Sequence, residues 1–194
     1  MTDYSLLTDF LDGKSNKPLN LKGVKLINVD LSGDNLSKLD FTGSDMSQSG
    51  FVNSNLSETV LNNVNLYKAQ MNLCNLRSAQ LNNANLSEVN FDSAILVNAS
   101  LIASNLQESS LVDANLTEAN LEGANLRKTA LWNSNFRGAI LKNVDLEGAG
   151  VTDCDFSFAN LIGAKLKGVM FSGDNRFEGA VITKDQMKYL NPDI

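Results

Sequence analysis

The sequence predicts a solenoid, in which short extended segments and tight turns wind the chain repeatedly around one axis. Every fifth residue from Leu21 to Phe171 is apolar, over 31 positions without exception, although apolar residues make up only 43% of the chain. The residue two places before each of these is small at almost every repeat, with 12 Ala, 6 Ser, 6 Val, 2 Thr and 2 Cys. A period of five matches neither the helical period of 3.6 nor the strand period of 2. The chain must therefore turn by a fixed angle every five residues.

Each unit of five residues offers one large and one small apolar side chain, and its other three positions are mostly polar. We call the large one the central residue and the small one, two places earlier, the inner small residue. If both point inward, the central residues fill the axis of the rod and the small residues let the backbone close around them. The repeat therefore predicts a continuous apolar core and a polar surface.

Several units share the same triplet of small residue, asparagine and leucine. Examples are Ala84-Asn85-Leu86, Ala114-Asn115-Leu116, Ala119-Asn120-Leu121, Ala124-Asn125-Leu126 and Ala159-Asn160-Leu161, with Ser54-Asn55-Leu56 and Cys74-Asn75-Leu76 as close variants. With these residues the sequence resembles the pentapeptide repeat family, whose pattern is A(D/N)LXX. The resemblance implies an all-β fold, a right-handed quadrilateral β-helix with about 20 residues per coil and about 7–8 coils.

The first 18 residues precede the repeat and are expected to form an N-terminal capping segment. Residues 2–12 can form a short helix with four apolar residues on one face, and Gly13 would end it. The four residues are Leu6, Leu7, Phe10 and Leu11. Such a helix would cover the open backbone at the start of the stack, which otherwise invites edge-to-edge association.

Residues 19–173 are expected to form the β-helix, in which residues 20 apart stack in columns. One column has two glutamates between two lysines, so the glutamates repel each other unless each leans towards a lysine. Two further columns consist of asparagine, whose amides can hydrogen-bond along the rod. These columns are Lys68, Glu88, Glu108 and Lys128; Asn65, Asn85, Asn105 and Asn125; and Asn35, Asn55, Asn75, Asn115 and Asn135. The columns indicate a scaffold that is held together along its length.

Residues 174–194 are expected to form an exit loop and a C-terminal capping helix. Residues 174–180 break the five-residue register and would form the loop. Thr183 and Gln186 have the spacing of a capping box, and Ile182 and Met187 that of a hydrophobic staple. Met187 and Leu190 are then expected to lie over the last coil.

Composition excludes several functions. The net charge of −6 argues against direct nucleic-acid binding, and the chain has no histidine, the commonest general base and metal ligand. We expect no catalytic residue, cofactor or metal. Cys74 and Cys154 lie four coils apart, roughly 19 Å, too far for a disulfide. No signal peptide or membrane-spanning stretch is evident. The expected location is the cytoplasm, although secretion without an N-terminal signal peptide stays open.

Function must then come from the outer surface, where apolar residues are least expected. Val112 and Trp132 are neighbours in one outward column and form a candidate partner patch. Other outward apolar residues are Val52, Tyr67, Leu73, Ile102, Ile140 and Ile162. The first hypothesis is a rigid, non-enzymatic scaffold or protein-binding module with an unknown partner, with a regulatory or effector role open. We expect a monomer or an end-to-end homodimer.

The alternative hypothesis is an inhibitor or protector of DNA gyrase that mimics DNA, of the Qnr and MfpA type, which the resemblance to the pentapeptide repeat family also allows. The net charge of −6 and a C-terminal helix are compatible with this role. The distribution of charge is less so, because Lys68, Arg127 and Lys128 offset the acids on one face and the acids on the other faces are scattered, so no face carries an uninterrupted acidic stripe.

Overall fold

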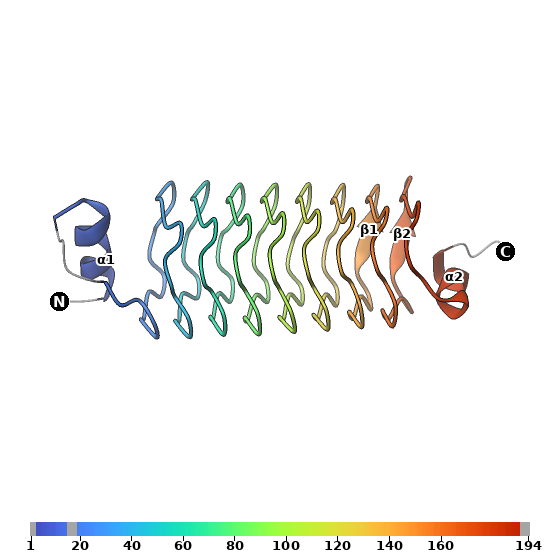
Figure 1. Cartoon of the computed structure of the whole chain (residues 1–194), viewed down its shortest axis with the longest axis horizontal. Helices are drawn as coiled ribbons and strands as arrows, with labels where there is room; N and C mark the ends of the chain where they lie inside the picture. The colour runs from blue at the N-terminus through green and yellow to red at the C-terminus, as the bar shows by residue number, and fades with distance from the viewer. Residues whose placement is uncertain (1–2, 15–18, 191–194) are drawn as a thin grey trace.

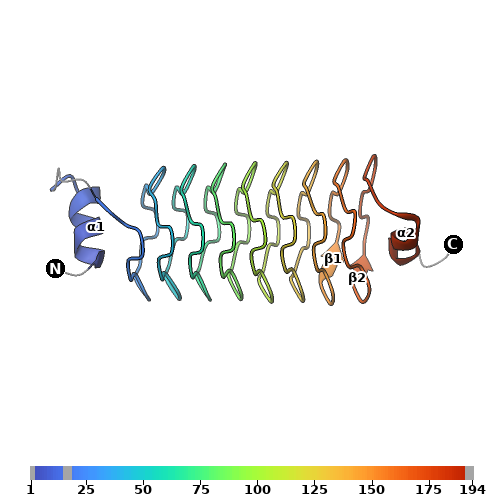
Figure 2. The same ribbon diagram turned by 60° about the horizontal axis from the view of Figure 1, so that its bottom comes forward.

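The computed structural model describes residues 3–14 and 19–190 of the chain. It is a straight rod of stacked coils with one short helix at each end (Figures 1 and 2). Helix α1 spans Asp3–Leu11 and helix α2 spans Lys184–Leu190. Strands β1, Gly150–Thr152, and β2, Met170–Ser172, pair in parallel on neighbouring coils.

The coils are joined by parallel bridges between residues 20 apart. Each bridging residue immediately precedes a central residue, as in the bridge Asn85↔Asn105. Leu86 N donates to Asn105 O at 2.7 Å, and Asn105 N donates to Ala84 O at 2.9 Å. Four units of five residues therefore make one coil with four sides, as the resemblance implied.

The four sides are named by the bridging residues of one coil. Side A carries Asn120, side B Asn125, side C Ala130 and side D Asn135, each with the residues 20 positions earlier and later. The residue after each central residue flanks the same side, and the next residue forms the corner.

The core follows the predicted pattern. Central residues from Leu21 to Leu166 are buried, and so are most of the inner small residues. Phenylalanine rings stack along the axis near the C-terminal end: Phe136 on Phe156 with centroids 5.0 Å apart, and Phe156 on Phe177 at 5.2 Å. Burial raises the pKa of the Cys74 thiol to about 12, against a weaker opposing backbone hydrogen bond. Both cysteines are buried and free, in agreement with their expected role as small core residues.

A corner residue with positive φ turns the chain at each unit. Glycine occupies ten of these corners from Gly23 to Gly179, and other residues occupy the rest, among them Leu73 and Phe158, both at 62°. Only glycine fits at residue 179, because an added Cβ would lie 2.7 Å from the ring of Phe158. The five-residue period requires a tight turn in each unit, and one residue in the left-handed conformation makes that turn.

The β-helix continues beyond residue 173, where the sequence had suggested that it ends. Arg176 bridges to Asp155 and Val181 bridges to Asn160, so the spacing changes from 20 to 21 residues. One extra residue is accommodated at the corner, where Asn175 Nδ2 donates to Ser172 O at 2.7 Å and its Oδ1 accepts Cys154 N at 2.9 Å. The expectation of an exit loop at 174–180 is therefore wrong, because a one-residue insertion shifts the register without breaking the ladder.

Helix α1 lies against the first coil through a narrow stripe. Leu7 is fully buried, whereas Leu6 and Phe10 are exposed, so the expected apolar face is only partly buried. Asp3 Oδ2 accepts Lys25 N at 2.8 Å, and the Tyr4 hydroxyl donates to a backbone oxygen of the same coil. The helix thus provides partners for part of the open backbone edge.

Helix α2 begins with the predicted capping box. Gln186 Oε1 accepts Thr183 N at 2.8 Å. Its Nε2 donates to Leu161 O at 2.7 Å and Ala164 O at 2.9 Å, so the Gln186 side chain is buried against the last coil. The expectation for Met187 is wrong: 53% of this residue is exposed, because the amide of Gln186 takes the inward position. Leu190 packs against the core as expected.

Candidate interaction surfaces

The predicted patch of Val112 and Trp132 lies on side C, on two adjacent coils. Asp113 N donates to Trp132 O at 2.9 Å, which fixes the two coils against each other. Val112 is half-buried, whereas 52% of Trp132 is exposed. The indole Nε1 lies 3.2 Å from the position that a Cβ on Gly150 would take. The indole therefore rests beside the bare backbone of the next coil, where the absence of a side chain leaves room for it.

The same side continues to Met170, which the sequence reasoning missed. Met170 pairs with Gly150 between β1 and β2, and 63% of it is exposed. Because Ala130 and Gly150 carry little or no side chain, they leave a low surface between the larger residues. The outward column Ala130, Gly150, Met170 was visible in the sequence once residues were grouped by 20. We call the surface formed by Val112, Trp132 and Met170 the side C patch.

A second apolar cluster lies on side A near the C-terminal end. Ile140 and Val181 both bridge to Asn160. Phe158 forms the corner that precedes Asn160, and Ile162 lies on side A just after it. All four apolar residues are exposed by 37–49%. The Arg137 guanidinium lies 4.5 Å from the centroid of the Phe158 ring, so this ring already has a cationic partner. Sequence reasoning found Ile140 and Ile162 but missed Phe158, which occupies a corner position.

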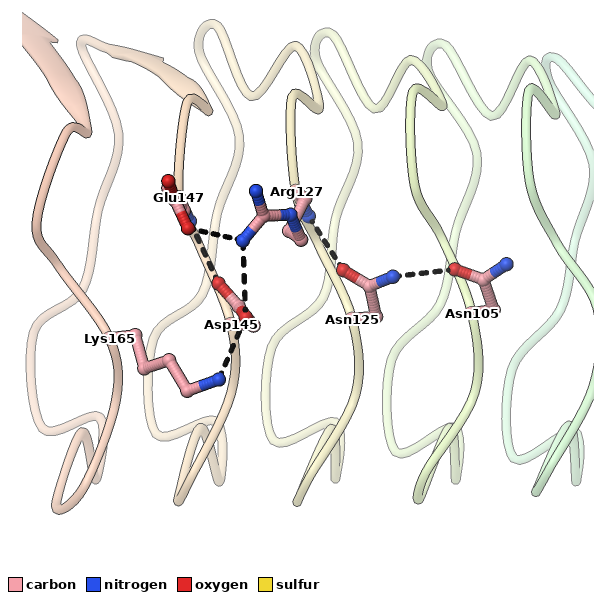
Figure 3. Close-up of polar contacts among 6 residues, drawn as sticks. All are labelled: Asn105, Asn125, Arg127, Asp145, Glu147 and Lys165. Carbon is pink, nitrogen blue, oxygen red and sulfur yellow. Dashed lines mark hydrogen bonds and ion pairs between the residues drawn. The ribbon is translucent and has the colours of Figure 1, made fainter.

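Side B is polar and carries the predicted asparagine column (Figure 3). Asn125 Nδ2 donates to Asn105 Oδ1 at 2.9 Å, and Asn125 Oδ1 accepts Arg127 N at 3.1 Å. Each such amide ties two coils together and also supports its own turn. The other predicted asparagine column, on side D, starts in the same way, with Asn55 Nδ2 donating to Asn35 Oδ1 at 3.0 Å.

Ion pairs continue the column towards the C-terminus. Asp145 lies 3.0 Å from Lys165 Nζ and 3.6 Å from the Arg127 guanidinium, which also contacts Glu147 (Figure 3). Partial burial of Asp145 opposes ionisation, but the hydrogen bonds from Lys165 and Glu147 N and both cations outweigh it and lower its pKa. These charged side chains of side B are therefore paired with one another.

The expected charged column on side B also forms ion pairs. Lys68 Nζ lies 3.3 Å from Glu88, and Lys128 Nζ lies 3.0 Å from Glu108. Each of the two glutamates thus leans towards a lysine, the arrangement that avoids their mutual repulsion. Exposed pairs of this kind contribute little to stability, about 0–1 kcal/mol.

Among the hollows near the C-terminal end, one adjoins Trp132 and another adjoins helix α2. One, of about 390 Å³, lies at the corner between sides C and D and is lined by Asn133, Asp153, Asp155, Asp174 and Arg176, with Ser134, Asn135 and Cys154. The other, of about 490 Å³, lies at the end of the rod, between Val169, Phe171, Phe177 and the Tyr189 and Leu190 side chains of α2. The first is polar and adjoins Trp132 through Asn133.

Within residues 3–14 and 19–190, no group of three or more histidine, cysteine, aspartate or glutamate side chains is arranged to hold a metal ion. Over the same residues, neither helix has the length and apolar character needed to cross a bilayer.

The fold and the repeat define the class of protein. The chain matches the family model for pentapeptide repeats (8 copies) over residues 20–51, 40–77, 54–92 and 140–173, and that for the pentapeptide repeat region over residues 74–151. It belongs to the pentapeptide repeat family, whose members form right-handed β-helices.

Similar solved structures are members of the same family. HetL, a protein involved in heterocyst differentiation regulation from the cyanobacterium Nostoc sp. strain PCC 7120, is 25% identical with a TM-score of 0.47, over 93% of this chain and 94% of HetL. A thylakoid lumen protein from Arabidopsis thaliana is 27% identical with a TM-score of 0.43, over 59% of this chain and 79% of that protein.

QnrB1, a plasmid-mediated fluoroquinolone resistance protein, is 20% identical with a TM-score of 0.34, over 86% of this chain and 97% of QnrB1. No curated protein matches the chain at a significant level.

Proposed function

We propose that this chain is a rigid, non-enzymatic binding module that docks a protein partner on the side C patch. The observation that supports this most directly is that Trp132 is exposed and lies beside Gly150, where the backbone carries no side chain. A large aromatic residue on a flat, rigid surface is the usual anchor of a protein interface. The stacked coils hold the patch in place through bridges on every side, so little conformational freedom is lost on binding.

The experiment compares two matched variants in pull-downs from a lysate of the source organism. Trp132→Ala removes the anchor on side C, and Phe158→Ala removes an equally exposed aromatic residue on side A. We expect the partner to be lost with Trp132→Ala and kept with Phe158→Ala, while both variants retain the circular dichroism spectrum and melting temperature of the parent. Retention of every captured protein by Trp132→Ala would refute the proposal.

The state of association belongs to the same proposal. We infer a monomer or an end-to-end homodimer, because helices α1 and α2 provide partners for backbone groups at the two ends. The hollow of about 490 Å³ at the C-terminal end is where a second copy would meet this one. Light scattering decides between the two states, and long, concentration-dependent polymers would contradict both.

Inhibition or protection of DNA gyrase remains an alternative with less support. A DNA mimic needs a continuous acidic surface, whereas the acids of side B are paired with Lys68, Lys128, Arg127 and Lys165. A supercoiling assay with purified gyrase tests this alternative, and inhibition at micromolar protein would favour it over the module.

A further inference from the structure

The charge around the side C patch is asymmetric. On its border with side B, Lys128 is paired with Glu108 at 3.0 Å. On its border with side D, Asp113, Asp153 and Asp174 are all exposed, and no lysine or arginine among the described residues lies within ion-pair distance of them. The patch is therefore flanked on one border by negative charge that the chain itself does not pair.

This charge converges on the polar hollow beside Trp132. Asp153, Asp155 and Asp174 line it together with a single basic residue, Arg176, so acidic side chains predominate in its lining. Asp153 Oδ1 accepts Asp174 N at 2.7 Å, and Asp155 Oδ1 accepts Ser157 N at 2.8 Å. These bonds fix two of the three carboxylates in place, so the hollow is formed before any ligand arrives.

The surroundings of Asp155 favour its charged form. Partial burial opposes ionisation of Asp155, but the hydrogen bonds from Ser157 and the charges of Arg176 and Arg137 outweigh it and lower its pKa. A hollow of about 390 Å³ has room for a guanidinium or ammonium group. Arginine fits this place better than lysine, because its planar group can bind two carboxylate oxygens at once and can stack on an aromatic ring.

We propose that the partner of side C presents a basic segment, in which an arginine enters the hollow lined by Asp153, Asp155 and Asp174 while a neighbouring apolar residue packs on Trp132. Asn133 belongs to the hollow and follows Trp132 directly, so adjacent residues of one bound segment can reach both. This inference rests on the proposed function and adds the chemical class of the partner. The combination of an apolar anchor and a fixed acidic rim selects against acidic and purely apolar partners.

The single tryptophan of the chain makes the test direct, because Trp132 fluorescence reports only on this surface. The probe is the capped peptide Arg-Leu-Arg-Leu-Arg, and its matched control carries citrulline, a neutral analogue of arginine, at all three arginine positions. We expect a saturable change of emission with the arginine peptide and at least about tenfold weaker binding of the citrulline peptide.

The double variant Asp153→Asn/Asp174→Asn is expected to weaken binding of the arginine peptide about tenfold, since asparagine keeps the shape and hydrogen bonds but removes two charges. The double variant Glu118→Gln/Glu122→Gln removes the same charge from side A and is expected to leave binding unchanged. Absence of saturable binding, or equal effects of the two double variants, would overturn the inference.

The two proposals fail in different ways. If Trp132→Ala loses its partner in the pull-down but Asp153→Asn/Asp174→Asn keeps it, the docking surface stands and the basic partner is wrong. If Trp132→Ala keeps its partner, the docking surface itself is wrong.

Discussion

The side chain of Gln186 donates from one amide nitrogen to the carbonyl oxygens of both Leu161 and Ala164, at 2.7 and 2.9 Å. Replacing Gln186 with leucine keeps the size of the side chain but removes the donor of Ala164 O and leaves Leu161 O with Ala164 N as its donor. We expect the free energy of unfolding to fall by about 1–3 kcal/mol. Urea denaturation followed by circular dichroism measures it, with Met187→Ala as the exposed control, expected within about 0.5 kcal/mol of the parent. Equal stability of the two variants would show that α2 does not hold the last coil.

Gly150→Ala tests the relation between Trp132 and the bare backbone beside it. The new methyl group would lie 3.2 Å from Trp132 Nε1, so the indole must move outward. We expect a red-shifted tryptophan emission with little loss of stability, within about 0.5 kcal/mol, because the exposed ring is free to shift. Asn72→Ala, at the position equivalent to Trp132 three coils earlier, serves as the control. An unchanged emission maximum would mean that the indole does not rest there.

Leu73 is a corner residue with φ of 62°, a conformation that is unfavourable for leucine and well tolerated by asparagine. Because 54% of Leu73 is exposed, its replacement loses little apolar burial. We expect Leu73→Asn to raise the free energy of unfolding by about 0.5–1 kcal/mol. The same substitution at Ile102, which is exposed but has no positive φ, is expected to give no gain. A loss of stability in Leu73→Asn would contradict the assigned backbone strain.

The raised pKa of the Cys74 thiol predicts that the free energy of unfolding falls at alkaline pH. Its pKa is raised to about 12 in the folded chain from an ordinary value of 9.0, so the unfolded chain releases this proton first as the pH rises. The stabilising effect is complete below pH 9 and decreases between pH 9 and 12. At pH 10 we expect Cys74 to lower the free energy of unfolding by about 1.4 kcal/mol.

Cys74→Ala isolates this effect from other alkaline titrations, because alanine is the commonest residue at the inner small position. The difference in stability between parent and variant should be constant up to pH 9 and then shift in favour of the variant. A difference that is independent of pH up to 11 would show that the thiol ionises without unfolding.

The repeat allows the core to be predicted residue by residue, because a period of five leaves no other arrangement for Leu86 and its equivalents. What escaped prediction lies where the period gives no information. The insertion before Arg176 hides the continuation of the ladder, although Phe177 and Ile182 follow Phe156 and Leu161 at a spacing of 21. The exposure of Leu6 also escaped prediction. The sequence of a helix shows which residues share its apolar face, but not how much of that face the first coil will cover.

The candidate surface was predictable in part. Trp132 was found because an aromatic residue stands out in a polar column. The hollow beside it could not be found from the repeat, because Asp155 and Arg176 meet through the 21-residue spacing. Phe158 was missed, although Leu73 at another corner was recognised as outward.

The stacking of residues 20 apart also sets how such a chain can change its length. Removing or duplicating a whole coil of 20 residues would shorten or lengthen the rod while every later side chain kept its side. Removing a single unit of five would instead rotate everything that follows by a quarter turn. Lost between Val112 and Trp132, five residues would place these two side chains on different sides of the rod without leaving a gap in the core. The side C patch would be lost, although the composition of every remaining unit would be unchanged.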